Sequence, residues 1–234
     1  MRVFCLVALG ASTLAACSSG STVGATAPPP VVLTGTNVNP DGFSYPSPAG
    51  GYGHNARIGQ TPGSIMQNFK FYGFPDGDMS QGLQTISLAD YYDPCSKRYT
   101  LLRISVAAVW CVPCNEETAA LVADEATLAK KRVVVIQALG DGPTMGTGAT
   151  QTDLTAWVTK YKPTFTEMLD PNLTNLGSFF DASEIPWNCD IDPRTMEILQ
   201  AATGWSGDLS SDLALPLAEA APAAPGYPIA VTCN

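Results

Sequence analysis

Two apolar runs of strand length, with a helical segment between them, limit the folds open to this chain. Residues 99–109 read YTLLRISVAAV and residues 133–139 read VVVIQAL, and each run is apolar enough to form a strand buried on both faces. Residues 115–132 between them are predicted to be helical, because acidic residues occupy the first turn and basic residues the last. The apolar face of this helix is expected to carry Ala119, Val122, Ala126 and Ala129. A strand, a helix and a strand in this order indicate an α/β fold.

Shorter elements surround this unit. Residues 68–72 and 83–88 have β-like patterns on either side of a turn-rich stretch, which predicts an N-terminal β-hairpin. The later patterns predict helices at 152–161 and 173–181, a strand at 165–169 between them, and a final hairpin of strands 187–191 and 196–201. Together, these elements predict an α/β sandwich with a mixed central sheet.

The length and charge of the chain set further bounds. Its 234 residues are 45% apolar, enough for one domain with a sizeable core. Lys and Arg number 12 against 21 Asp and Glu, giving a net charge of −9, and no basic run could follow a phosphate backbone. We therefore expect a solvated acidic surface and no nucleic-acid partner.

The N-terminus has the pattern of an export signal. Residues 1–16 contain one Arg, an apolar segment too short to span a bilayer, and then small residues, as in a secretory signal peptide. The stretch Leu14-Ala15-Ala16-Cys17 resembles a bacterial lipobox, which implies lipid on Cys17 and attachment to a membrane. In similar lipoproteins, Ser18 at the next position favours the outer membrane over the inner one. The domain would then face the periplasm, an oxidising compartment in which disulfides persist.

Composition divides the rest of the chain. Residues 17–55 are rich in Ser, Thr, Gly and Pro, which predicts a linker. Residues 56–205 hold the strands and helices described above and form the predicted domain. Residues 206–234 are expected to form a short helix interrupted at Pro216 and then an Ala- and Pro-rich tail.

Two cysteines lie where the first buried strand gives way to the helix, in the stretch AAVWCVPCNEE. Unpaired backbone N–H groups and the positive end of the helix dipole favour a thiolate at this junction, so Cys111 is the expected nucleophile. Cys114 is one turn further along and on the same side, a spacing that suits attack on a mixed disulfide at Cys111. The pattern indicates a working dithiol.

WCVPC after a buried strand resembles the thioredoxin superfamily, in particular exported, membrane-tethered thiol-disulfide oxidoreductases of the redoxin and cytochrome-c-maturation type. The similarity extends over roughly residues 57–205 and includes the N-terminal hairpin. It implies a thioredoxin-like three-layer sandwich with an added hairpin. It also implies that Pro186, in SEIPW, is a cis-proline that lies against the disulfide and helps to bind an extended substrate.

Other residues near the dithiol follow or depart from this resemblance. Thioredoxin has a buried acid six residues before the first cysteine, whereas this chain has Ser105. Glu117 matches a glutamate that tethered relatives often carry three residues after the second cysteine. It could shuttle protons to Cys114 or simply cap the helix. Trp110 is expected to shield the disulfide by packing.

Three further cysteines, Cys95, Cys189 and Cys233, follow the lipobox and lie outside the dithiol. We expect one structural disulfide among them and prefer Cys95–Cys233, because Cys189 lies within a predicted core strand. The sequence alone leaves the pairing open.

Other kinds of site fit less well. A zinc site needs about four ligands, which one CxxC and the single histidine, His54, do not supply, so we predict no metal ligand and no cofactor. A peroxiredoxin-type peroxidase would need a Thr or Ser where the chain has Ala108. Another alternative to disulfide exchange is a non-catalytic, thioredoxin-fold lipoprotein that binds a partner. In that case the disulfide would be purely structural.

The function that the sequence favours is disulfide exchange with exported proteins by a membrane-tethered domain. Cys111 would attack and Cys114 would resolve the mixed disulfide. The expected partners are exported protein dithiols or disulfides and a membrane electron donor or acceptor, with the membrane itself bound through lipid on Cys17. The direction of electron flow cannot be read from WCVPC.

Overall fold

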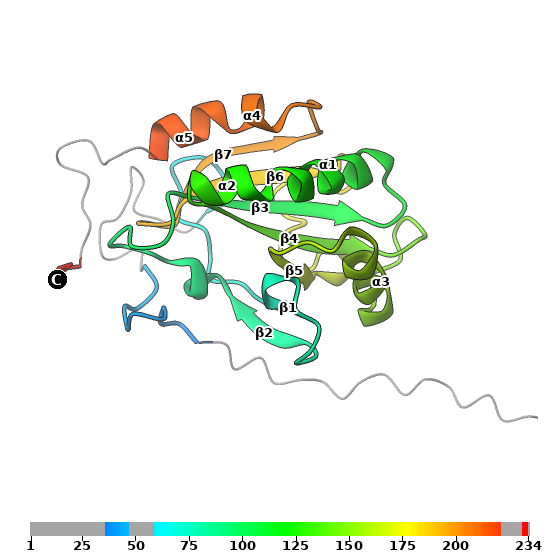
Figure 1. The fold of residues 1–234 in the computed structure, drawn as a ribbon, viewed down its shortest axis with the longest axis horizontal. Helices are drawn as coiled ribbons and strands as arrows, with labels where there is room; N and C mark the ends of the chain where they lie inside the picture. Colours follow the sequence, from blue (N-terminus) through cyan, green and yellow to red (C-terminus); the bar gives the residue numbers. More distant parts are fainter. Residues whose placement is uncertain (1–35, 47–58, 221–230, 234) are drawn as a thin grey trace, which may run out of the picture. The chain divides into compact units, whose positions relative to one another are not determined.

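A seven-stranded mixed sheet lies at the centre of the computed structural model, which describes residues 36–46, 59–220 and 231–233 (Figure 1). The strands are β1 Lys70–Phe74, β2 Gln84–Ser87, β3 Leu101–Ala108, β4 Val133–Asp141, β5 Thr166–Leu169, β6 Trp187–Asp192 and β7 Glu197–Thr203. Their order is β2-β1-β5-β4-β3-β6-β7, in which β3, β4 and β5 are parallel and the other neighbouring pairs are antiparallel. The predicted α/β fold, its mixed sheet and its N-terminal hairpin, formed by β1 and β2, are confirmed.

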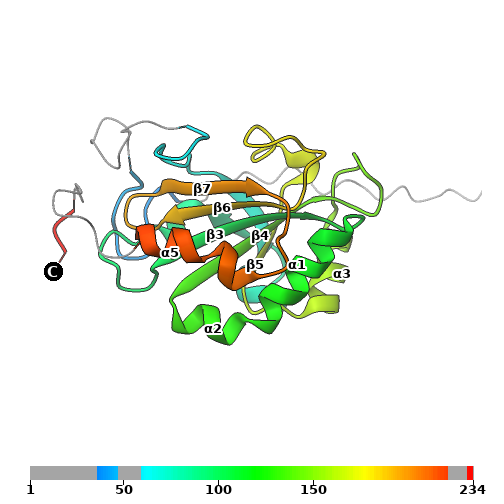
Figure 2. The same ribbon diagram turned by 90° about the horizontal axis from the view of Figure 1, so that it is seen from above.

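The α-helices of the described chain cover one face of this sheet. They are α1 Val112–Ala123, α2 Glu125–Lys130, α3 Gln151–Tyr161, α4 Leu209–Asp212 and α5 Ala214–Ala220. Because β3, β4 and β5 are parallel neighbours, right-handed crossovers through α1 and α3 place both helices on the same side. Figure 2 shows α2 and α5 on this side as well. The helical layer therefore covers β3, which ends beside the predicted dithiol, and β6, which begins there.

The opposite face of the sheet is covered by turns and short 3-10 helices. Its core contains Ile104, Ile136 and Trp187, and Phe180 stacks on Trp187 with ring centroids 5.0 Å apart. The 3-10 helices of the described chain are Pro75–Gly77, Leu88–Tyr91 and Pro171–Leu173. These segments, rather than α-helices, supply the third layer of the sandwich.

Part of the predicted linker packs on this second face. In residues 36–46, the Asn39 side chain donates a hydrogen bond to the carbonyl of Tyr92 at 2.9 Å, and the Tyr45 hydroxyl donates to the carbonyl of Met66 at 2.8 Å. This segment therefore belongs to the folded unit. The predicted signal peptide, Cys17, His54 and residues 221–230 of the tail lie outside the described residues. Within the described residues, no helix is both long and apolar enough to cross a membrane.

The helix after the dithiol differs from the prediction in extent and in its buried face. It begins at Val112 rather than at residue 115, and it divides at Asp124 into α1 and α2. The buried side chains are Cys114, Glu117, Thr118, Leu121 and Leu128, whereas Ala119, Ala126 and Ala129 are exposed. The alanine periodicity indicated the wrong face, because alanine gains little from burial and the contacts under α1 are partly polar.

Two other predicted helices also differ. The helix predicted at 173–181 is absent: a 3-10 helix at Pro171–Leu173 is followed by turns. Asn172 and Leu173 have φ values of 56° and 54°, in the left-handed region, which ends a right-handed helix. The C-terminal helix is interrupted at Leu213, not at Pro216. Pro216 lies in the first turn of α5, where its missing N–H is not needed.

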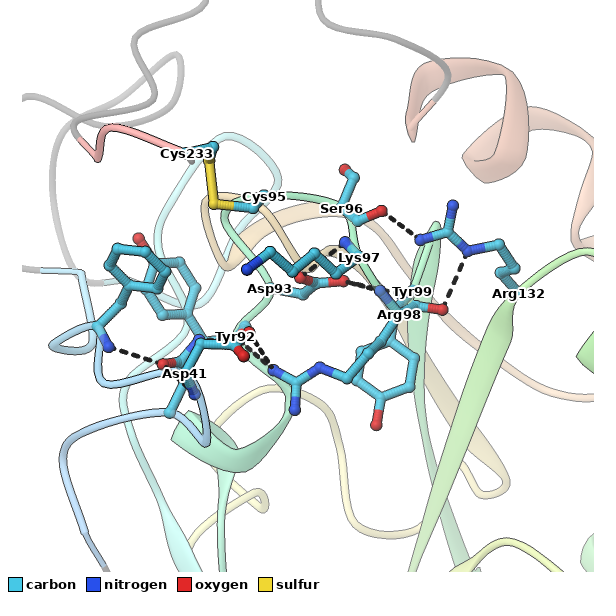
Figure 3. Close-up of polar contacts among 12 residues, drawn as sticks. Asp41, Tyr92, Asp93, Cys95, Ser96, Lys97, Arg98, Tyr99, Arg132 and Cys233 are labelled. Carbon is cyan, nitrogen blue, oxygen red and sulfur yellow. Dashed lines mark hydrogen bonds and ion pairs between the residues drawn. A yellow bond between two sulfur atoms is a disulfide. The ribbon is translucent and has the colours of Figure 1, made fainter.

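A disulfide joins Cys95, in the loop before β3, to Cys233, with Cα atoms 5.6 Å apart (Figure 3). This is the pairing that the sequence favoured. The loop is also held from within, since the buried carboxylate of Asp93 accepts three backbone hydrogen bonds, from Lys97, Arg98 and Tyr99. Arg98 lies 3.5 Å from Asp41 of the segment 36–46. Cys189 is buried and unpaired in β6.

Candidate active site

Cys111 and Cys114 form a disulfide at the junction of β3 and α1. Strand β3 ends at Ala108, and Cys111 is the N-cap residue of α1. The Cys111 sulfur accepts a hydrogen bond from the backbone N–H of Cys114 at 3.1 Å. The first N–H groups of a helix have no partner within the helix, so they can stabilise negative charge on this sulfur.

The disulfide lies below the surface, beneath a rim formed by Val112, Trp110 and the Pro186 loop. Cys111 is 1% exposed, whereas the neighbouring Val112 is 67% exposed. The carbonyl oxygen of Ile185 lies 3.6 Å from the Cys111 sulfur, and the Ile185–Pro186 peptide bond is cis. The carbonyl of Pro186 accepts a hydrogen bond from Gly204 at 2.7 Å, which ties this loop to the end of β7. The Pro186 loop therefore lies against the disulfide.

Trp110 forms another part of this rim. It is half-buried, packs in the same apolar cluster as Cys111, and donates a hydrogen bond from Nε1 to Asp141 at 3.3 Å. The same oxygen of Asp141 accepts the backbone N–H of Gly146 at 2.7 Å. The end of β4 thus fixes the indole beside the dithiol.

Asn115 holds the turn that carries the two cysteines, and sequence reasoning missed it. Its side-chain amide donates to the carbonyl of Cys111 at 2.6 Å, and its oxygen accepts hydrogen bonds from Lys160 and Tyr161 of α3. The amide thereby links the start of α1 to the end of α3. The sequence carried one sign of this role for Asn115, namely a polar residue directly after the second cysteine.

Glu117 is fully buried, one turn after Cys114 on the side of α1 that faces the sheet. Its Oε1 accepts a hydrogen bond from the Asn188 side chain at 2.6 Å, whereas its Oε2 has no hydrogen-bond partner. Burial raises the pKa of Glu117 to about 7, against the opposing effects of the Asn188 hydrogen bond and the charge of Arg103. A carboxyl group that titrates near neutral pH can accept and return a proton.

A buried ion pair lies beside Glu117. Arg103 on β3 donates from Nε and Nη2 to the two oxygens of Asp190 on β6, at 2.9 and 2.8 Å. Both residues are 2% exposed, and the Arg103 Nη1 has no hydrogen-bond partner. One sign of this pair is visible in the sequence, a single arginine within the run YTLLRISVAAV.

Polar side chains continue in a row across the sheet beneath α1. Ser105, at the position of thioredoxin's acid, pairs in register with Gln137 of β4 and Asn188 of β6. Gln137 in turn pairs with Glu167 of β5, whose two carboxyl oxygens are buried with no hydrogen-bond partner. Burial raises the pKa of Glu167 well above its ordinary value. The helix-covered side of the sheet therefore holds two buried carboxyl groups, Glu117 on α1 and Glu167 on β5.

The described residues include no group of three or more His, Cys, Asp or Glu side chains that could hold a metal ion.

The mixed sheet and the disulfide where β3 meets α1 define a thioredoxin-like fold with a CXXC pair. No protein-family model matches the sequence, and no curated protein matches it either. Among solved structures, the chain is similar to a protein of Chlorobium tepidum named as a thiol:disulfide interchange protein, DsbE, at 17% identity and a TM-score of 0.53. That match covers 69% of this chain and 99% of the other.

A second similar structure is AhpC from Enterococcus faecalis, at 13% identity and a TM-score of 0.50, covering 69% of this chain and 92% of the other. At these identities the similarity establishes the fold.

Proposed function

We propose that this chain is a thiol-disulfide oxidoreductase that exchanges disulfides with exported proteins through Cys111 and Cys114. The observation that carries the proposal is the position of the Cys111 sulfur at the first turn of α1, where it accepts the N–H of Cys114. The same contact would stabilise a Cys111 thiolate after reduction, and thiolates are the species that attack disulfides. The Pro186 loop, beside this sulfur, is the surface on which an extended partner would lie.

The exchange would proceed in two displacements. In the first, the Cys111 thiolate attacks one sulfur of the partner's disulfide, and the other sulfur leaves as a thiolate. In the second, Cys114 gives its proton to Glu117 and attacks the Cys111 sulfur, which closes the Cys111–Cys114 bond and releases the partner's remaining thiolate. Run in reverse, the same steps oxidise a partner dithiol.

Access to Cys111 would be controlled by the rim. Because Cys111 is nearly buried, we expect a partner's sulfur to approach between Val112 and the Pro186 loop, with Trp110 packing on one side. An exposed, flexible segment of a partner protein fits this approach better than a folded surface does.

We also propose that the domain is exported and lipid-anchored at Cys17, facing the periplasm, with the outer membrane favoured by Ser18. The Cys95–Cys233 disulfide supports this, because structural disulfides persist mainly in oxidising compartments. A membrane electron donor or acceptor would then be needed to restore the dithiol or the disulfide after each exchange.

The test is disulfide reduction of insulin by the purified full-length protein. We expect Cys111→Ser to abolish the activity, because it removes the attacking sulfur, and Cys114→Ser to accumulate mixed disulfides. Cys189→Ser is the matched control, since Cys189 is buried and unpaired. Full activity in the Cys111 variant would contradict the proposal, and a wild-type disulfide that could not be cycled would favour the non-catalytic binding protein.

The direction of electron flow follows from the reduction potential of the pair. A value near the thioredoxin end of the known range, about −250 mV or lower, would identify a reductant, and one near about −120 mV an oxidant.

A further inference from the structure

Lys160 lies in the last turn of α3, and its ammonium group is held beside the dithiol turn, residues 111–114. It donates a hydrogen bond at 2.7 Å to Oδ1 of Asn115, the residue directly after Cys114. The ammonium also lies over two aromatic rings, 4.5 Å from the centroid of Tyr161 and 5.9 Å from that of Trp157. These contacts fix the position of a charge on a side chain that is itself exposed.

The Asn115 side chain joins this ammonium to the backbone of Cys111. Its Oδ1 accepts hydrogen bonds from Lys160 and from the Tyr161 hydroxyl, and its Nδ2 donates to the carbonyls of Cys111 at 2.6 Å and Val109 at 3.2 Å. An ammonium can only donate and a carbonyl can only accept, so these partners allow the amide one orientation. The amide is therefore a fixed link between the charge on α3 and the turn that carries the reactive sulfur.

The distance over which the charge acts is short. Two hydrogen bonds of 2.7 and 2.6 Å and one amide group separate the Lys160 nitrogen from the Cys111 carbonyl oxygen, so these two atoms are at most roughly 8 Å apart. The Cys111 sulfur belongs to the same residue as this oxygen. At about 10 Å, a fixed charge near a protein surface changes the equilibrium for forming a second charge by roughly twofold to tenfold.

Most other charged side chains on the elements around the dithiol are carboxyl groups. They are Glu116 and Glu117 on α1, Asp141 at the end of β4, and Glu184 beside the Pro186 loop. When ionised, each of these disfavours a second negative charge on Cys111. Beneath α1, the charge of Arg103 is paired with that of Asp190. The ammonium of Lys160 therefore opposes the carboxylates at the dithiol turn.

We infer that Lys160, held by Asn115, is a positioning residue that stabilises the reduced Cys111–Cys114 pair and thereby raises its reduction potential. The inference rests on the proposed function and deepens it, because the potential decides whether the pair reduces or oxidises a partner. A Cys111 thiolate carries a negative charge that the disulfide lacks. The nearby ammonium therefore lowers the free energy of the reduced state relative to that of the oxidised state.

Equilibration with glutathione measures this effect. The full-length protein is held at pH 7 in mixtures of reduced and oxidised glutathione, and the thiols in the peptide that carries Cys111 and Cys114 are counted by mass after alkylation. Oxidation breaks the S–S bond of glutathione disulfide and forms the Cys111–Cys114 bond. The two glutathione molecules that result leave as one thiolate and one thiol, the latter with the proton of Cys114.

The key variant is Lys160→Met, which removes the charge and keeps an apolar side chain over the two rings. It should raise the equilibrium constant for oxidation roughly twofold to tenfold, because the reduced state loses a stabilising charge. Lys160→Arg keeps the charge and should retain the wild-type constant. Lys130→Met is the matched control, since Lys130 is also exposed in the last turn of a helix, α2, but precedes the start of β4, at the opposite end of the sheet from the dithiol. Equal constants in Lys160→Met and Lys130→Met would overturn the inference.

Two further measurements separate an effect of charge from one of packing. The difference between wild type and Lys160→Met should shrink when salt is raised from about 0.01 to about 1 M, because the screening length falls from about 30 to about 3 Å. In an Asn115→Ala background, Lys160→Met should change the constant less, since the ammonium has lost the acceptor that holds it. A difference that does not depend on salt, or an equal effect in both backgrounds, would refute the role assigned to Lys160.

The proposed function and this inference fail in different ways. A wild-type disulfide that glutathione cannot reduce reversibly would contradict the function and the inference together. A wild-type pair that cycles, with the same equilibrium constant in Lys160→Met, would contradict the inference alone.

Discussion

Replacing Glu117 by Gln should stabilise the oxidised protein, and by an amount that depends on pH. Glu117 is fully buried, and one of its two carboxyl oxygens has no partner. Glutamine keeps the size of the side chain and an oxygen that can accept the hydrogen bond from Asn188, but it cannot ionise. The substitution therefore isolates the cost of carrying a carboxylate at this position.

The magnitude follows from the displaced titration. The pKa of Glu117 is raised from its ordinary value of 4.5 to about 7. Between these values the native state retains a proton that the unfolded state has lost, so stability falls as the pH rises through this window. At about 1.4 kcal/mol for each pH unit, the full cost above about pH 7 is roughly 3 kcal/mol. Glutamine avoids this cost.

The assay is urea denaturation of the oxidised wild-type and Glu117→Gln proteins at about pH 4 and about pH 8. We expect the stability difference between them to increase by roughly 3 kcal/mol in favour of the variant over that range. Glu116→Gln is the matched control, because Glu116 is exposed at the preceding position of the same helix. A difference between wild type and Glu117→Gln that is the same at both pH values would refute the assignment of a displaced titration to Glu117.

Three other changes test the packing around the site. Glu167→Met should raise the free energy of unfolding near pH 7 by about 1–3 kcal/mol, since it removes two buried, unpartnered oxygens, and a loss of stability in urea denaturation would contradict this. Gly73→Ala should cost about 1–3 kcal/mol or more, because a Cβ there would lie 2.1 Å from the backbone oxygen of Glu167; unchanged stability would argue against this close approach of β1 and β5. Replacing both Cys95 and Cys233 by Ser should cost about 2–5 kcal/mol in the same assay and leave insulin reduction intact, and a loss of activity in the folded variant would contradict a purely structural bond.

The two central strands, β3 and β4, were the most predictable elements from the sequence. β3 and β4 are long apolar runs, and a strand buried on both faces admits few other side chains, so their patterns were unambiguous. The position of Cys111 at the strand–helix junction followed from the change of pattern at that point. By contrast, the stretch 173–181 contains apolar residues at helical spacing, but Leu173 adopts a left-handed conformation, which depends on its tertiary contacts.

The polar surroundings of the dithiol could not be predicted, because they join residues distant in the sequence. Asn188 lies 71 residues from Glu117, and Asp190 lies 87 residues from Arg103. The register of β3 against β6 brings Arg103 to Asp190, and the packing of α1 on the sheet brings Glu117 to Asn188. A glutamate on a helix is usually solvated, so the burial of Glu117 depended on which face of α1 packs on the sheet.

The bond between Cys95 and Cys233 also imposes an order on the maturation of the protein. The two residues are 138 positions apart, so they can meet only after every strand of the sheet has been synthesised, whereas Cys111 and Cys114 can pair as soon as that turn has emerged. Until then, Cys95 is a free thiol on the same nascent chain as two reactive ones. Once β3 forms, its eight residues separate Cys95 from the dithiol by roughly 26 Å. Early formation of this one strand would therefore protect the chain from mispairing before its last cysteine arrives.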